Sequence, residues 1–235
     1  MKKRLVVYLA VFFAAVFSQL QAQKSSYPIS YDGNKAVVTG FVSFEPLSDE
    51  HIFANAYFWV LDNVCTVRKD EIKDMDIENK SFKFNVKATS LETSKLKNIY
   101  TMEISVKVLS GKLVFYISDV WIEGQNGLIR KTVALNSLKI ETKAKDKEIA
   151  DDFVRSESSI LNKMFAFINI NDMQKISHWS DIANENVVKG MNEDEVRLSV
   201  GKPRTIIDSG KEIQWMYNAS FYIFFKNGKV DSIMR

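Results

Sequence analysis

The stretch NVVKGMNEDEVRLSVGKPRTIIDSGKEIQWMYNASFYIFFKNGKV, residues 186–230, carries the most complete set of local folding signals in the chain. Asn192 precedes three acidic residues, which predicts a helix with an asparagine N-cap and a capping box completed by Glu195. Gly201 and Pro203 end this helix, because glycine adopts the left-handed conformation readily and proline cannot continue a helix. The sequence therefore predicts one short, well-capped helix over residues 193–200.

A second helix is predicted before it and three strands after it. The earlier helix has Ala183, Val187 and Val188 facing inward and ends at Gly190. Beyond Pro203 the apolar residues recur with a period of two, which indicates strands. The alternating residues are Ile213, Trp215 and Tyr217, then Phe221, Ile223 and Phe225, then Val230 and Ile233. Asn227-Gly228 favours a two-residue type I′ hairpin between the last two strands.

This order resembles the small outer-membrane lipoprotein A family (SmpA/OmlA), which includes the BamE component of the β-barrel assembly machinery. The residues that carry the resemblance are Gly190-Met191, Glu195-Val196, Gly201, Pro203, Trp215, Tyr217, Phe225, Gly228 and Val230. The resemblance implies a small ααβββ domain with the fold of β-lactamase-inhibitor proteins, of a kind that serves as a docking module in envelope proteins. It implies no catalytic residue, and a fold alone does not identify a partner.

The N-terminus is typical of a secretory signal peptide. Lys2, Lys3 and Arg4 precede an apolar core over residues 5–17, and Ala22 offers a small residue for cleavage. A transmembrane helix needs about 20 apolar residues, so this core is too short for a permanent anchor. No cysteine stands at the cleavage site, which excludes lipid attachment there. The sequence predicts a leader over residues 1–22 and a periplasmic or secreted protein.

The charge balance argues against nucleic acid as a partner. The chain has 32 basic and 29 acidic residues, and three of the basic residues lie in the leader. The processed chain would then carry 29 residues of each sign and no basic stripe for phosphate contacts.

The residues that commonly perform catalysis or bind metals are sparse. Cys65 is the only cysteine, and His51 and His178 are the only histidines. His51 lies almost four turns from Cys65 on one predicted helix, too far for a catalytic pair, and neither histidine has the spacing of a zinc ligand. The phosphate-loop, dinucleotide and serine-hydrolase motifs are absent. The sequence therefore predicts no cofactor, no metal and no enzyme activity.

One carboxylate cluster leaves an alternative open. Asp74 and Asp76 share a face of a predicted strand, close to Asp70 and Glu71. Paired carboxylates can bind a cation or perform acid–base chemistry. They also border the turn Asn79-Lys80, where charged residues usually contact solvent.

Residues 27–170 form a second predicted domain. A strand over residues 37–44 is followed by a helix capped by Ser48, on which Phe53, Tyr57, Leu61 and Val64 line one face. Alternating strands follow around residues 82–86, 100–108 and 113–122, and an amphipathic helix runs from Ile149 to Phe167. The aromatic run Ala56–Trp59 and the run Asp119–Trp121 make this order similar to a family of exported bacterial domains of unknown function with a TBP-like fold. The predicted class is α+β, with an antiparallel sheet and helices.

Two function classes remain at this stage. One is an exported, non-catalytic binding or scaffolding protein of the Gram-negative cell envelope that contacts an unidentified envelope protein. The other is a hydrolase or ligand-binding protein whose carboxylates come together only in the fold. A deep cleft with converging acids would favour the second, and an exposed apolar patch the first.

The candidate interaction surface lies in the C-terminal domain, residues 180–235. Tyr222 and Phe224 alternate with the inward residues of their strand, and Met216 alternates with Trp215 and Tyr217. All three are therefore expected on the outer side of the sheet. Two interpretations stay open: the N-terminal domain or the linker Ile168–Trp179 covers this cluster, or the cluster binds a partner.

Overall fold

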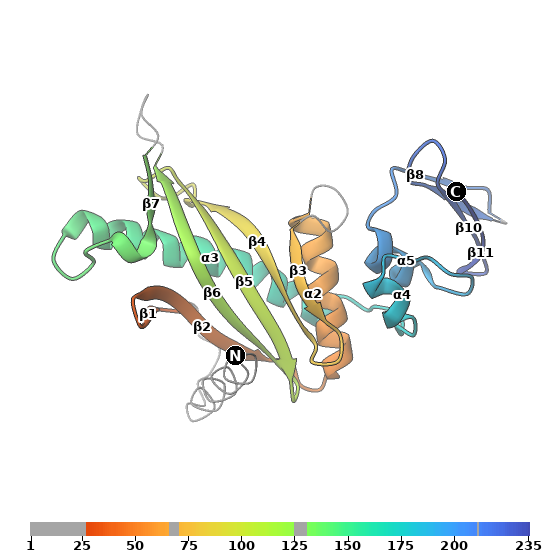
Figure 1. Ribbon diagram of the computed structural model, residues 1–235, viewed down its shortest axis with the longest axis horizontal. Helices are drawn as coiled ribbons and strands as arrows, with labels where there is room; N and C mark the ends of the chain where they lie inside the picture. The colour runs from red at the N-terminus through yellow and green to blue at the C-terminus, as the bar shows by residue number, and fades with distance from the viewer. Residues whose placement is uncertain (1–26, 66–70, 125–130, 211) are drawn as a thin grey trace, which may run out of the picture.

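The computed structural model describes residues 27–65, 71–124, 131–210 and 212–235 and is an α+β protein with two antiparallel sheets (Figure 1). Its N-terminal part contains β1 (Ile29–Asp32), β2 (Lys35–Ser43), α2 (Asp49–Asn63), β3 (Ile72–Asp76), β4 (Ser81–Thr89), β5 (Asn98–Leu109), β6 (Lys112–Gly124), β7 (Lys131–Ala134), the 3-10 helix η1 (Leu135–Ser137) and α3 (Ala144–Ile170). Its C-terminal part contains α4 (Trp179–Ala183), α5 (Glu193–Val200), β8 (Thr205–Asp208), β9 (Ile213–Met216), β10 (Tyr222–Lys226) and β11 (Lys229–Met234). The predicted α+β class is confirmed. The predicted leader, residues 1–22, and Asp70 lie outside the described residues.

The larger sheet follows the order β1-β2-β6-β5-β4-β3, with β7 paired to β6. The predicted alternation of β5 is confirmed, since its even-numbered residues from Asn98 to Val108 are buried and its odd-numbered residues face outward, half-buried, up to Lys107. Helices α2 and α3 pack on the buried side of this sheet (Figure 1). Asp119, at positive φ, interrupts β6, and the register against β5 shifts between Thr101 and Glu103.

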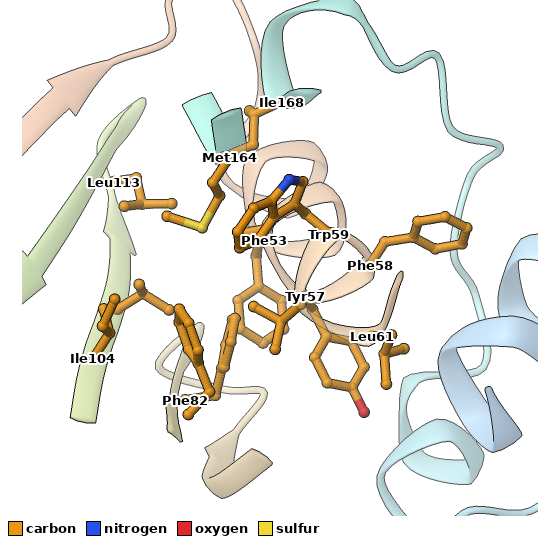
Figure 2. Close-up of a cluster of buried hydrophobic side chains, with 14 of the residues drawn as sticks. Phe53, Tyr57, Phe58, Trp59, Leu61, Phe82, Ile104, Leu113, Met164 and Ile168 are labelled. Atoms are coloured by element: carbon orange, nitrogen blue, oxygen red, sulfur yellow. The ribbon is translucent and has the colours of Figure 1, made fainter. Parts of the chain in front are cut away.

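Helix α2 is buried around its whole circumference, which the sequence pattern did not predict. All ten residues from Ile52 to Leu61 are buried. Figure 2 shows Phe53 and Tyr57 pointing toward Phe82 of β4, and Trp59 lying near Met164 of α3. The prediction of a single apolar face was incomplete, because a helix enclosed by a sheet, a second helix and a further unit needs apolar side chains in every direction.

Ser48 caps α2 as predicted, since the His51 N–H donates to the Ser48 hydroxyl oxygen at 3.2 Å. Asp49 in the first turn accepts the backbone N–H groups of Ser110 and Gly111 at 3.1 and 2.6 Å. These bonds tie the start of the helix to the tight β5–β6 turn and so fix how α2 lies on the sheet.

In the C-terminal part, α4 and α5 are followed by a sheet of order β11-β10-β9-β8. The capping box of α5 is confirmed: Asn192 Oδ1 accepts the Glu195 N–H at 2.8 Å, and Glu195 Oε2 accepts the Asn192 N–H at 2.8 Å. The sheet has four strands rather than the three expected, because β8 forms from Thr205–Asp208, a segment without alternating apolar residues.

The helix expected to end at Gly190 is much shorter than predicted. Helix α4 ends at Ala183, and Glu185 takes a φ of 55°, a left-handed conformation that stops the helix. Val187 is buried but not helical. The sequence signal failed here because the residue in the left-handed conformation is Glu185, a glutamate, and non-glycine residues adopt positive φ too seldom for a sequence pattern to predict it.

The two parts of the chain are joined by directed contacts. Arg197 of α5 donates to both carboxylate oxygens of Asp62 on α2, at 2.9 Å each, and its guanidinium lies 4.3 Å from the centre of the Phe58 ring. The Trp179 indole N–H donates to Glu50 at 2.9 Å. Buried residues of both parts belong to one continuous apolar cluster, and the division into domains at 170 and 180 stays a prediction. Across the described ranges, no helix is both long enough and apolar enough to cross a membrane.

Candidate interaction surface

The strand register assigns the residues of the four-stranded sheet to two faces. Residues that pair directly across antiparallel strands point to the same side, and neighbours along a strand alternate. Met216 pairs with Tyr222 and with Thr205, and Tyr222 pairs with Met234. The side that carries these residues is called the outer face. It consists of Thr205, Ile207, Gln214, Met216, Tyr222, Phe224, Lys226, Lys229, Ser232 and Met234.

The structure brings the three predicted residues together on this outer face. Met216 and Tyr222 are direct cross-strand partners, and Phe224 follows Tyr222 by two positions. All three are half-buried. Ile207 and Met234 extend the cluster to the two edge strands, and each keeps about half of its surface exposed, at 52% and 51%. The charged residues of this face are Lys226 and Lys229, which pair with each other at its hairpin end.

The opposite side of the sheet, called the inner face, packs against the helices. Trp215, Ile223 and Phe225 are buried, and the rings of Trp215 and Phe225 lie 4.6 Å apart. The Tyr217 hydroxyl donates to the carbonyl oxygen of Gly201 at 2.9 Å, which ties the end of β9 to the end of α5. Burial raises the pKa of this tyrosine, which stays a neutral donor. The outer face therefore belongs to a sheet whose opposite side is packed against the helices.

The linker does not cover the outer face. Its backbone binds α5 instead: the Gln174 N–H donates to Asp194 at 2.9 Å, and the Ser177 N–H donates to Glu195 at 2.5 Å. Met173 and Ile176 of the linker are buried in the core shared by the two parts. The direct contacts with α2 come from α4, α5 and the segment after α5, on the inner side. The expectation that the linker or the N-terminal part shields this cluster is not met among the described residues.

The carboxylate of Glu195 binds the backbone of the linker. Burial would raise the pKa of this carboxyl group, but hydrogen bonds from the backbone N–H groups of Ser177 and Asn192 outweigh burial, so the pKa lies below its usual range. His178 Nδ1 lies 3.0 Å from Oε1 of the same carboxylate, and this contact also lowers the pKa. A residue quoted for the family resemblance thus has a structural role here.

The carboxylates considered as an alternative site do not converge. Asp74 has a φ of 49° at an irregular point of β3 and forms an ion pair with Lys83 at 2.8 Å. Asp76 instead accepts the backbone and side-chain N–H groups of Asn79 at 2.9 and 2.7 Å. In each case these partners lower the carboxylate pKa. Within the described residues no group of three or more metal-ligating side chains is assembled.

Two further carboxyl groups, on α3, are fully buried and were not singled out from the sequence. Asp152 accepts the hydroxyl groups of Ser90 and Tyr100, at 2.6 and 2.5 Å, and these bonds lower its pKa against the effect of burial. Burial raises the pKa of Glu157 to about 8, and only the Ser158 hydroxyl, at 3.0 Å, opposes the shift. Five residues apart, the two side chains point about 140° apart around the helix, so they do not form a pair.

A shallow groove lies along α3. Apart from Leu91, its lining residues are polar, basic or small: Arg155, Ser158, Ser159, Asn162, Lys163 and Ala166. None of them is an acid, so this groove is not the cleft of converging carboxylates that would favour a hydrolase. Cys65 is half-buried at the end of α2, and His51 Nε2 lies 3.2 Å from the carbonyl oxygen of Asn171, so each has a packing role.

Sequence reasoning missed two members of the outer face, Ile207 and Met234. Ile207 lies in a strand that the alternation did not reveal, and Met234 lies beyond the last residue used for the pattern. The signal that could have found Ile207 is the pair Ile206-Ile207 between two turns, Gly201–Pro203 and Ser209–Gly210.

Comparison with known proteins identifies the fold of the N-terminal part. A TBP-like protein from Parabacteroides distasonis superposes with a TM-score of 0.50 at 12% sequence identity, over 61% of this chain and 98% of that one. A DUF4468 family protein from Bacteroides ovatus gives a TM-score of 0.47 at 11% identity, over 63% and 94% of the two chains. The superposition on the TBP-like protein supports a TBP-like fold for the N-terminal part, and identity this low concerns fold alone. No protein-family model matches the chain, and no curated protein matches it.

Proposed function

We propose that this protein is an exported, non-catalytic binding protein of the cell envelope, and that it holds a protein partner on the outer face of its C-terminal sheet. The observation that carries the proposal is an apolar and aromatic cluster on the outer face, formed by Ile207, Met216, Tyr222, Phe224 and Met234. A soluble protein seldom leaves such a patch open unless it binds something. Export is inferred from the leader sequence.

The surroundings of the patch support a protein partner over a small molecule. The outer face is one side of a four-stranded sheet, whereas small ligands bind in concave sites. Aromatic and methionine side chains are the types enriched at protein interfaces, and charged residues are depleted there. Lys226 and Lys229 stand at the hairpin end of the face, exposed, which favours a partner with acidic residues beside its apolar contact.

The resemblance of residues 186–230 to the SmpA/OmlA family supports a docking role for the C-terminal part. The capping box, the glycine-proline stop and the inward Trp215 and Phe225 agree with that pattern. The strand β8 is an addition to the three strands that the resemblance implies. We propose that the C-terminal part is a docking module of this general kind, carried by a TBP-like N-terminal part.

Site-specific crosslinking in intact cells tests the proposal. A photo-reactive phenylalanine analogue at Tyr222 or Phe224 should capture a discrete protein, and the same analogue at Trp121, which is 52% exposed on the larger sheet, serves as the matched control. A product that forms from the outer-face positions and not from position 121 supports the proposal. Equal capture from both sheets, or none from the outer face, would contradict it.

A further inference from the structure

The two edge strands of the C-terminal sheet differ in whether another segment of the chain pairs with them. At the β11 edge, the Gly190 N–H donates to Val230 at 2.9 Å and the Val230 N–H donates to Met191 at 2.7 Å, so the segment before α5 occupies that edge. At the other edge, β8 has no neighbouring strand within the described chain, and all four of its residues are exposed. An exposed edge strand presents backbone groups that can pair with another strand.

The hydrogen-bond ladder identifies which backbone groups point outward. The Ser209 N–H donates to the Glu212 carbonyl at 3.1 Å, which makes these two residues a hydrogen-bonded pair of the β8–β9 ladder. Because such pairs alternate along an antiparallel ladder, Thr205 and Ile207 also bond toward β9. The N–H and C=O groups of Ile206 and Asp208 therefore point away from the sheet.

The outward groups of Ile206 and Asp208 allow β8 to pair with a second copy of itself. For two antiparallel copies related by a two-fold axis through the sheet, a residue on one face must meet a residue of the same face. Placing the axis at Ile206 sets the two Ile206 residues opposite each other. Arg204 then lies opposite Asp208 of the second copy, and Thr205 lies opposite Ile207. This register forms two backbone hydrogen bonds between the two Ile206 residues, by the geometry of the antiparallel ladder. The Arg204 N–H already donates to the Met216 carbonyl at 2.8 Å, so it does not bond to Asp208 of the second copy.

The charges at the two ends of β8 are complementary in this register. Arg204 is exposed, and its guanidinium group makes no ion pair or hydrogen bond within the described residues. Asp208 is exposed, and one of its oxygens accepts the Gly210 N–H at 2.7 Å, which leaves the other to accept a further donor. Two-fold symmetry forms the Arg204–Asp208 pair twice, and opposite charges facing each other across strands stabilise pairing.

We propose that two copies of this chain associate through antiparallel pairing of β8 with β8, about a two-fold axis at Ile206. The association joins two four-stranded sheets into one continuous sheet and buries Ile206, which is 55% exposed in the single chain. It does not depend on the function proposed above. It places the two outer faces side by side, so that a partner would meet a surface twice as wide.

Disulfide trapping tests the register directly. Opposed residues of a hydrogen-bonded antiparallel pair have Cα atoms about 5.5 Å apart, within disulfide range. Cysteine in place of Ile206 (I206C) should therefore give a crosslinked dimer under mild oxidation. Cysteine in place of Ile207 (I207C) is the matched control, because in this register the two 207 positions lie about 8–9 Å apart, beyond that range. The parent chain controls for Cys65. Preferential crosslinking at 207, or none at 206, would overturn the proposal.

A charge exchange tests the association without relying on cysteine. The protein is expressed from its full sequence, purified as the host processes it, and followed by sedimentation velocity over a range of concentrations. Arg204→Asp sets like charges opposite each other twice and should weaken the dimer by about tenfold or more. The double variant R204D/D208R restores opposite charges and should recover most of the affinity.

Lys226→Glu is the matched control for the charge exchange, since it changes the net charge equally but lies on β10, two strands away from β8. It should leave the dimer within about twofold of the parent. A monomeric parent at every concentration, or a dimer that Arg204→Asp and Lys226→Glu weaken equally, would refute pairing through β8. Neither result bears on whether the outer face binds another protein.

Discussion

The outward residues of β5 in the larger sheet are Ile99, Thr101, Glu103, Ser105 and Lys107, whereas those of β10 in the smaller sheet are Tyr222, Phe224 and, at its end, Lys226. Both strands bury their alternate residues against helices, so the inner faces follow the same rule. The difference lies outside: β5 presents mostly polar side chains to water, and β10 presents aromatic rings. Since folding requires only the inner face to be apolar, the aromatic outer face of β10 points to contact with something else.

The largest effect is expected from the inner face of the smaller sheet. Trp215→Ala should lower the free energy of unfolding by about 3–5 kcal/mol, because the buried ring leaves a cavity beside Phe225. The matched control is Trp121→Ala on the larger sheet, which removes a half-exposed ring and should cost below about 1 kcal/mol. Denaturant titration measures both. Equal costs would mean that the assignment of Trp215 to the inner face is wrong.

The second prediction compares the buried glutamates of the two parts. The pKa of Glu157 is raised to about 8, so its contribution to stability is fully present below the unfolded pKa and is lost as the pH rises through about 8. Glu157→Gln should therefore unfold less readily than the parent at pH 9, by roughly 3–5 kcal/mol, and differ little near pH 4. Thermal unfolding across pH measures the effect.

Glu148→Gln, at an exposed position of the same helix, is the control for Glu157 and should show no such trend. The stability contributed by Glu195 in the C-terminal part depends on pH in the opposite direction. Because its pKa is lowered in the folded state, Glu195 stabilises the fold above the unfolded pKa, and this stabilisation is lost as the pH falls through the folded pKa. A parent whose stability is the same at pH 5 and pH 9 would contradict the assignment for Glu157.

The third prediction asks whether the two parts stabilise each other. Arg197 and Asp62 are largely buried and bonded at two points, so a double-mutant cycle to alanine should give a coupling of about 1–3 kcal/mol. The pair Lys189–Asp231 lies at 3.3 Å within the C-terminal part but is exposed, and its coupling should stay below about 0.5 kcal/mol. Comparable couplings would mean that the contact with α2 adds no stability.

The smallest effect on stability is expected at the outer face. Tyr222→Ser and Phe224→Ser together should leave the chain folded, each costing about 1 kcal/mol or less, because both side chains are only half-buried. Circular dichroism and denaturant titration check the fold. The same double variant should lose the crosslinked partner. If the double variant unfolds instead, these rings belong to the core and the contrast between the two sheets disappears.

Most of the fold could be predicted from the sequence where a pattern is local. The capping box at Asn192, the N-cap at Ser48 and the alternation from Tyr100 to Val108 each depend on neighbouring residues, and each appears as expected. The short strands β1, β7 and β8 and the early end of α4 could not be predicted. These elements form because neighbouring strands and turns supply their hydrogen bonds, and their own residues show little alternation of apolar and polar side chains.

The candidate site divides in the same way. Parity along each strand was enough to place Met216, Tyr222 and Phe224 opposite Trp215, because side chains alternate along any strand. Parity could not say that Met216 and Tyr222 are neighbours, or that Ile207 and Met234 complete the face, since the register between strands comes from the ladder.

The sequence by itself determined the α+β class, the capped helix α5, the inward and outward residues of the main strands and the absence of local catalytic motifs. These follow from periodicity and from chemistry within a few residues. The tertiary structure alone decided that α2 is enclosed on all sides, that the linker binds α5 rather than the outer face, and that one edge of β8 has no neighbouring strand among the described residues. Each of these depends on contacts between residues far apart in the chain, whose geometry no local pattern encodes.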